Sequence, residues 1–242
     1  MIAATMQGLA QGANALTLAN LPDLESSDST KLYIISVSFT FFCALYIIEI
    51  LFQPKLTTRV TRHHWCVRIP SQYHAVMVTV IGWLCFFDTA LWSDPINSSS
   101  PVAVLGACII SGYMSADFIS VIVNFEDEGF TFLFHAIFTL APYAASLYTG
   151  KFYAISCTCL IAETSTVPLN LRYLCILSKR AGNAVFEAIQ LGFFLVFIVV
   201  RIFVANLCIS PIWFNMFGAI YVTGDKNGAF KWSEVSPRRD SF

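Results

Sequence analysis

Charged residues are scarce in this sequence of 242 residues. Asp, Glu, Lys and Arg make up 12% of the chain, whereas hydrophobic residues make up 57%. Soluble proteins carry roughly 25% charged residues, so a soluble fold would have too little charge to cover this much apolar surface. A bilayer solvates apolar surface, and the composition therefore predicts an integral membrane protein. The net charge of −1 gives no indication of a nucleic-acid partner.

Metal-binding and disulfide motifs are also missing from the sequence. The chain has 8 cysteines, and nearly all of them lie in apolar segments. Cys157 and Cys159 are close together, but no second cysteine pair and no His-x-His motif completes a metal site. Cysteines in apolar helices usually act as small hydrophobic residues. We therefore predict no metal site, no cofactor and no disulfide framework.

Apolar segments of transmembrane length follow one another along most of the chain. A helix needs about 20 apolar residues to cross the hydrocarbon core of a bilayer. We predict about six spans, at residues 32–52, 73–92, 102–123, 130–148, 152–177 and 184–208. The predicted fold class is therefore an all-α, multi-pass transmembrane helical bundle.

Polar segments flank this transmembrane region, which we place at residues 31–222. Residues 1–30 lack the compact apolar core of a signal peptide, and we interpret them as a polar N-terminal tail. Residues 223–242 form a second polar tail. The Pro-aromatic stretch at 209–222 is too short to cross the bilayer alone. We interpret it as a short re-entrant segment or as the end of a truncated chain.

Basic loops predict the orientation of the spans. The loop 54–72 and the loop after residue 177 contain Lys and Arg without acidic residues, and such loops stay on the cytoplasmic side. The loop 93–101 then faces the lumen, and it contains an N-glycosylation sequon at Asn97. His63 and His64 lie in the first basic loop, and we expect them at the membrane interface.

Ionisable residues inside the predicted spans suggest a functional site. A charge at mid-bilayer is unfavourable by at least about 2.5–3.5 kcal/mol, so such residues usually face a cavity or a partner. Asp117, His135, Glu163 and Arg201 all lie within spans. Arg201 either pairs with an acidic residue across the bundle or extends its guanidinium toward the interface.

Polar neighbours share the helix face of Asp117. Tyr113 precedes it by one turn and Asn124 follows it by two turns, so all three point in the same direction. Such a face serves either as a hydrogen-bonded packing device or as part of a site. We include Tyr113 and Asn124 among the predicted cavity or lipid-binding residues.

A similar polar face surrounds Glu163. Thr166 and Asn170 share this face. Pro168 cannot donate a hydrogen bond to the carbonyl of Thr164, so we expect a bend and a free carbonyl there. The combination is typical of a cavity wall, and a structural kink is the alternative.

The depths of three ionisable groups predict a shared cavity. His135 lies roughly 8 Å from the cytoplasmic start of its span, at 1.5 Å per residue. Asp117 lies near the cytoplasmic end of its own span, and Glu163 lies midway. A carboxylate beside an imidazole can act as a general base. The same groups can also form an inert polar plug, or a proton relay in a transporter.

Four segments combine polar residues in a recognisable order: Arg68-Ile-Pro-Ser71-Gln-Tyr-His74-Ala75, Gly112-Tyr113 with Asp117, Phe132-Leu-Phe-His135-Ala, and Glu163-Thr-Ser165-Thr166-x-Pro168-x-Asn170-x-Arg172, with Arg201 following. These segments resemble the TLC-domain family, which contains homologues of the translocating-chain-associating membrane protein, the yeast longevity-assurance protein and the ceroid-lipofuscinosis membrane protein. The resemblance places a TLC-like domain at about residues 60–222. The last span that family members have is not predicted in this sequence.

The resemblance implies a helical bundle with a polar interior, usually in the endoplasmic reticulum. Ceramide synthases of this family join a fatty acyl-CoA to a sphingoid amine and use a His-His pair. Here Phe134 occupies the first position of that pair, and only His135 is present.

Two functions follow from this comparison. The first is a membrane protein that binds lipid and influences lipid homeostasis, and the missing histidine and span favour it. The alternative is an acyltransferase of the ceramide synthase type, in which His135 is the base and Asp117 or Glu163 orients it. Membrane lipids are the expected partners of the first, and fatty acyl-CoA is a further partner of the second.

Overall fold

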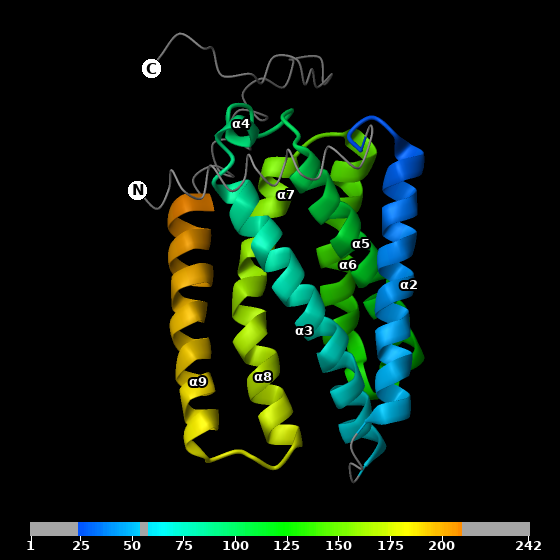
Figure 1. Ribbon diagram of the computed structural model, residues 1–242, viewed down its shortest axis with the longest axis vertical. Coiled ribbons are helices and arrows are strands. Elements are labelled where there is room, and N and C mark those ends of the chain that lie inside the picture. The colour runs from blue at the N-terminus through cyan, green and yellow to red at the C-terminus, as the bar shows by residue number, and fades with distance from the viewer. Residues whose placement is uncertain (1–23, 54–57, 210–242) are drawn as a thin grey trace.

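A computed structural model describes residues 24–53 and 58–209, with side chains up to residue 204. These residues form a bundle of helices that run side by side between two ends (Figure 1). The elements are α2 (Asp28–Phe52), α3 (Arg59–Phe86), α4 (Thr89–Trp92), α5 (Pro101–Val123), α6 (Phe125–Thr149), α7 (Tyr153–Cys159), the 3-10 helix η1 (Leu160–Ser165), α8 (Thr166–Leu177), α9 (Ala184–Phe197) and the π-helix η2 (Ile198–Ile209). The described part of the chain contains no strand.

The helices confirm the predicted all-α, multi-pass bundle. In the described residues, 5 helices are long and apolar enough to cross a membrane: α2, α3, α5, α6 and the segment Ala184–Val204. The span predicted at 152–177 is a succession of three shorter helices, α7, η1 and α8, which together run between the two ends of the bundle (Figure 1). The segment predicted to be re-entrant lies, except for Ile209, outside the described residues.

The helical path changes where a bend was expected from Pro168. The chain is a 3-10 helix from Leu160 to Ser165 and becomes α-helical again at Thr166. Pro168 therefore lies in the first turn of α8, where a missing backbone N–H leaves no hydrogen bond unmade. The bend lies just before the proline, and Glu163 lies within it.

Helix α3 differs most from the sequence prediction. We predicted a basic loop at 54–72 and a span at 73–92, but α3 begins at Arg59, capped by the Thr58 side chain, and ends at Phe86. Hydropathy identifies the residues that are apolar enough to lie in the hydrocarbon core of the bilayer. It does not identify the residue at which a helix begins, because a helix can start in the polar segment before the span. His63, which we expected at the membrane interface, lies in the first turns of α3, and only 6% of it is exposed.

Helix α5 lies at the centre of the bundle and packs against α2, α3, α6 and α7. Gly112 permits its close approach to α2, because a Cβ atom there would lie 2.6 Å from both the Ile35 carbonyl oxygen and the Ser38 Cβ. The Ser38 hydroxyl donates a hydrogen bond of 2.8 Å to the Ile109 carbonyl across the same contact. This packing fixes α2 beside the polar face of α5.

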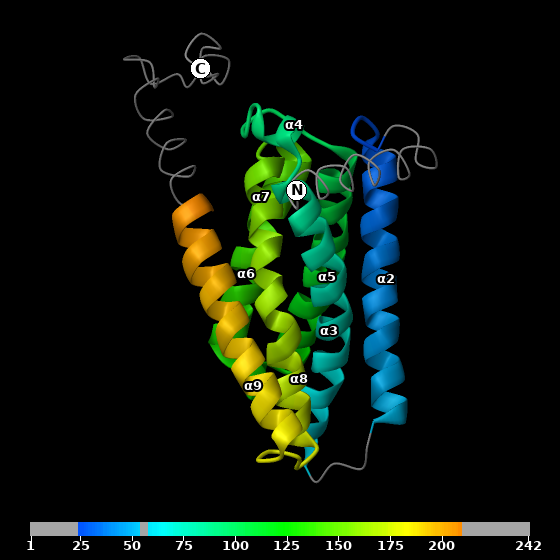
Figure 2. The same cartoon turned by 60° about the vertical axis from the view of Figure 1, so that its left-hand side comes forward.

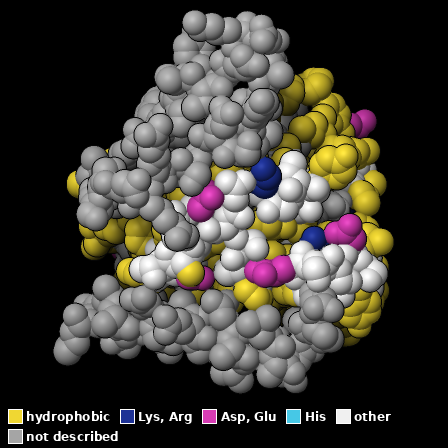
Figure 3. Space-filling model, turned by 90° about the horizontal axis from the view of Figure 1, so that it is seen from above, with side chains coloured by type: hydrophobic (Ala, Val, Ile, Leu, Met, Phe, Trp, Pro, Cys, Tyr) yellow, Lys and Arg dark blue, Asp and Glu magenta, His cyan; other side chains and the backbone are white. Residues whose placement is uncertain are grey.

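One end of the bundle carries basic residues beside the acidic residues Glu126, Asp127 and Glu128. The α2–α3 and α8–α9 connections lie at the same end (Figure 2). This end carries Arg59, Arg62, Lys179 and Arg180. Figure 3 shows the opposite end, where Asp and Glu side chains and Lys or Arg side chains lie among uncharged polar groups. Because basic loops stay on the cytoplasmic side, we interpret the end with the α2–α3 connection as cytoplasmic.

Candidate functional site

A polar cavity lies inside the bundle. Its volume is about 330 Å³, and α3, α5, α6, η1, α8 and η2 all contribute to its wall. The polar residues that line it are Arg68, Ser71, His74, Tyr113, Asp117, Ser120, Glu128, Thr131, His135, Glu163, Thr166 and Arg201. So many ionisable groups around one space are rare within a membrane-spanning bundle, where each must be satisfied by a partner or a ligand.

The residues singled out from the sequence lie in or near this cavity. Those that line it are Asp117, His135, Glu163, Tyr113, Thr166 and Arg201. Asn124 lines a neighbouring groove instead. Asn170 lies behind the cavity wall with 0% exposure. There it links two cavity residues, donating to the Ser71 hydroxyl at 3.0 Å and accepting from the Arg68 guanidinium at 3.4 Å.

The carboxyl groups of Asp117 and Glu163 face the cavity from α5 and η1. Neither forms a hydrogen bond or an ion pair with another residue in the described part of the chain. Both are half-buried. An ionised carboxylate accepts hydrogen bonds through both oxygens. The two groups are therefore available to accept hydrogen bonds from a ligand.

His135 and Arg201 lie at the edge of the cavity. Both line it, and both are exposed at the surface of the bundle. The Arg201 Nε donates a hydrogen bond of 3.0 Å to the Ser165 hydroxyl. Because α6 and η2 carry these residues on the outer surface of the bundle, the cavity reaches the lipid-facing surface between them.

One face of α3 contributes residues that we did not predict as site residues. Arg68, Ser71 and His74 follow at intervals of three residues and all line the cavity. The Arg68 guanidinium lies 4.4 Å from the centre of the Tyr173 ring. The spacing was visible in the sequence, but it indicates a shared face only if the helix begins before Arg68. Placing Arg68 and Ser71 in a loop and His74 in a span concealed this face.

An apolar groove adjoins the polar cavity. It has a volume of about 420 Å³ and lies between α2, α3 and α5. The lining residues are Phe42, Cys43, Tyr46, Ile47, Ile50, Val67, Pro70, Tyr113, Ala116, Asp117, Ile119, Ser120, Val123 and Asn124. Four of them, Val67, Tyr113, Asp117 and Ser120, also line the polar cavity. The two spaces therefore share a wall.

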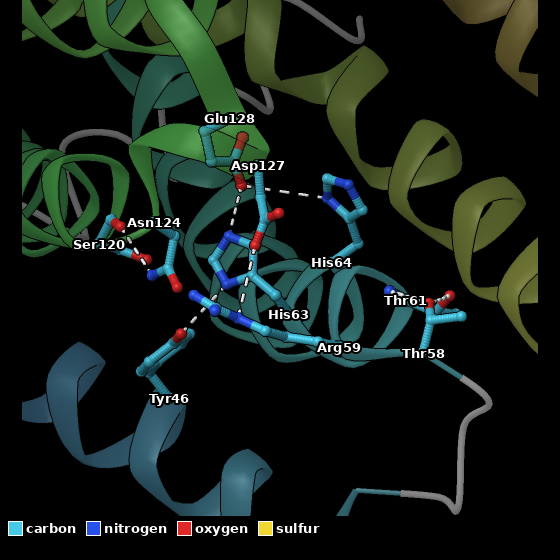
Figure 4. A network of polar contacts seen from close by, with 10 residues as sticks. All are labelled: Tyr46, Thr58, Arg59, Thr61, His63, His64, Ser120, Asn124, Asp127 and Glu128. Carbon is cyan, nitrogen blue, oxygen red and sulfur yellow. Dashed lines mark hydrogen bonds and ion pairs between the residues drawn. The ribbon is translucent and has the colours of Figure 1, made fainter.

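A network of polar contacts adjoins both spaces (Figure 4). His63 lies at its centre, 2.7 Å from a Glu128 carboxylate oxygen through Nε2 and 3.2 Å from the Tyr46 hydroxyl through Nδ1. A neutral imidazole fits this arrangement, with Nε2–H donating and Nδ1 accepting. Glu128 lines the polar cavity and Tyr46 lines the groove. The imidazole thus links helices α2, α3 and α6 at one point.

Glu128 belongs to a short turn that joins α5 to α6. The backbone of Gly129 has φ 73° and ψ −173°, so the turn is offset from the rest of α6. Residues without a glycine's freedom rarely adopt this conformation. Asp127, in the same turn, lies 3.9 Å from the Arg59 guanidinium. Polar contacts with α3 therefore hold this turn over the cavities.

Metal ligation does not explain the polar groups. Within residues 24–53 and 58–209, no three His, Cys, Asp or Glu side chains are close enough together to hold a metal ion. Asn97 lies apart from the cavity, at the end opposite the basic connections, and it is exposed. Its side-chain amide donates a hydrogen bond of 3.0 Å to Asp94.

Comparison with known proteins identifies the family. A relative in Danio rerio, TLC domain-containing protein 4-B, is 25% identical over 207 residues, covering 80% of this chain and 76% of its own. No solved structure matches the chain significantly. The family model of the TLC domain matches residues 64–233. This multi-pass membrane protein belongs to the TLC-domain family.

Proposed function

We propose that this protein binds a membrane lipid within its bundle and thereby influences membrane lipid composition, as a protein of lipid homeostasis. The observation that carries this proposal is the shared wall between a polar cavity and an apolar groove. A lipid has the same two parts, a polar head group and an acyl chain. Volumes of about 330 and 420 Å³ also fall in the usual range of ligand sites.

The charges of the polar cavity support a head group with both hydrogen-bond donors and acceptors. Asp117 and Glu163 supply acceptors. Arg68 and Arg201 supply guanidinium donors from other sides of the cavity. Because the cavity also reaches the surface between α6 and η2, a lipid can enter from the bilayer without crossing water. The endoplasmic reticulum is the membrane we propose, from the family resemblance.

A second candidate is acyl transfer of the ceramide synthase type. His135 lines the same cavity as Asp117 and Glu163, and this shared lining is the observation that favours it. In such a reaction His135 would take a proton from the attacking amine, and fatty acyl-CoA would be the acyl donor. Phe134 in place of a second histidine favours lipid binding over transfer.

Lipid binding is tested by purifying the protein in lipid nanodiscs and identifying retained lipid by mass spectrometry. Ile47→Trp fills the groove, whereas Ile48→Trp changes a neighbouring exposed residue that does not line it. We expect Ile47→Trp to lose the retained lipid and Ile48→Trp to keep it. Equal retention by both variants, or no lipid in the unmodified protein, would contradict the proposal.

Acyl transfer is tested in the same preparation by adding fatty acyl-CoA and a sphingoid base. An N-acylated product that disappears in His135→Ala would establish the second candidate. Retained lipid without product would exclude it and leave lipid binding as the function.

A further inference from the structure

The imidazole of His74 makes no hydrogen bond within the described part of the chain. Only 2% of the residue is exposed, and it lines the polar cavity. Its Nε2 atom has no hydrogen-bond partner. Buried polar groups nearly always have a partner, and an exception in a native protein calls for an explanation such as a ligand. His74 is therefore a polar side chain enclosed in a cavity wall and left unpaired.

The neighbours of His74 on α3 do have partners. Ser71 accepts a hydrogen bond from Asn170, and Arg68 donates one to the same residue. These two side chains are held in place by the protein itself. His74, one turn further along the same face, is held only by ring contacts. Its ring nitrogens are therefore available to form a hydrogen bond with a ligand.

These ring contacts place His74 at the boundary between the two spaces. Its ring stacks on Tyr113 with centres 3.8 Å apart and planes 13° apart. It also meets the edge of Phe42, at 6.0 Å. Phe42 lines the apolar groove, and Tyr113 lines both spaces. If one lipid occupied both spaces, the group that joins its acyl chain to its head group would lie beside the imidazole.

We propose that His74 hydrogen-bonds the carbonyl oxygen that joins the acyl chain to the head group of the bound lipid. This inference rests on the proposed function and narrows the ligand to acyl lipids with an ester or amide linkage. A neutral imidazole always carries one N–H donor, and a linkage carbonyl offers only an acceptor. Aromatic rings on both sides exclude water there, which strengthens the hydrogen bond. His74 is thus a specificity-determining residue for the linkage.

The inference is tested with two ligands that differ only at the linkage. A monoacylglycerol has an ester carbonyl, and the monoalkylglycerol of equal chain length has an ether in its place. Affinities for both are measured by native mass spectrometry of the full chain. We expect the unmodified protein to prefer the ester about tenfold, as expected for one hydrogen bond that the ether cannot make.

Variants identify the residue responsible. His74→Phe keeps the ring stack and removes the donor, so it should bind both lipids equally, with the affinity that the unmodified protein has for the ether. His74→Gln keeps an N–H donor and should retain part of the preference. Tyr73→Phe is the matched control, because Tyr73 is the adjacent exposed residue of α3 and does not line either space. It should retain the whole preference.

The outcomes separate this inference from the proposed function. Equal binding of ester and ether by the unmodified protein overturns the role of His74 and leaves lipid binding intact. An ester preference that persists in His74→Phe also overturns it, because another group then recognises the carbonyl. Binding of neither lipid contradicts lipid binding itself. The comparison of two ligands on the unmodified protein decides the question even if a variant fails to fold.

Discussion

The contact between His63 and Glu128 predicts a measurable coupling between α3 and α6. Both side chains are 5% exposed, and their atoms approach to 2.7 Å. The perturbation consists of His63→Leu, Glu128→Leu and the double variant. Each single replacement leaves a buried polar partner without its hydrogen bond, whereas the double variant removes both groups together.

The expected loss of unfolding free energy follows from the burial of His63 and Glu128. A hydrogen bond to a charged group contributes about 1.5–3 kcal/mol, and a buried polar group left without its partner costs about 1–3 kcal/mol, or more when it is charged. We expect each single variant to lose about 2–4 kcal/mol of unfolding free energy, since Tyr46 still satisfies one nitrogen of His63. Replacing both partners by apolar residues is often nearly neutral. The coupling energy should therefore exceed about 1.5 kcal/mol.

Reversible unfolding of the purified protein in mixed micelles, followed by helical circular dichroism, gives the free energies for the four proteins. His64→Leu is a matched control, because its Nδ1 lies 4.0 Å from the same Glu128 oxygen rather than 2.7 Å. It should show a much smaller coupling with Glu128→Leu. Single effects that add within about 0.5 kcal/mol would refute the role of the His63 contact.

Other predictions concern packing, the cavity wall and orientation. Gly112→Ala should lower the unfolding free energy by about 1–3 kcal/mol, because the added Cβ would meet α2. Gly192→Ala is the control and should not destabilise α9, because nothing lies within 4 Å of its Cβ position. Equal effects of the two variants would contradict the close contact between α2 and α5. Asn170→Leu should lower the unfolding free energy by about 1–3 kcal/mol, since Ser71 and Arg68 lose a partner, and an unchanged value would show that these bonds are dispensable. Expression in cells that glycosylate proteins should give a glycosidase-sensitive band that Asn97→Gln removes, and a glycan on a sequon introduced at the basic end instead would reverse the orientation.

The fold class could be predicted from the sequence because apolar length is what a bilayer selects. The predicted span at 102–123 and α5 (Pro101–Val123) differ by one residue at the start. Helix α3 shows the limit of this reasoning. Its first turns carry Arg59, Arg62 and His63, which hydropathy assigns to a loop, yet Thr58 caps them as a helix and Glu128 satisfies the imidazole. That partner lies far away in the sequence.

The site could be predicted only in part for a related reason. Asp117 and Glu163 are conspicuous as isolated charges in apolar segments, and this alone suggests a cavity. His74 was noticed only as part of a segment that resembles the family, and Glu128 lies in an acidic turn, so neither was predicted as a site residue. The apolar groove could not be predicted, since apolar residues facing a groove and apolar residues facing lipid are the same residue types. Only the packing of α2 on α5 distinguishes them.

The claim that the joined spaces bind a lipid is tested most directly by photocrosslinking. A lipid that carries a diazirine near the end of its acyl chain is added to the protein in nanodiscs, illuminated, and the adducts are located by peptide mass spectrometry. Adducts should concentrate on Phe42, which lines the groove and is only 2% exposed, and excess unlabelled lipid should compete them away. Adducts that resist competition and occur equally on Leu191, which is exposed on α9, would contradict a lipid site inside the bundle.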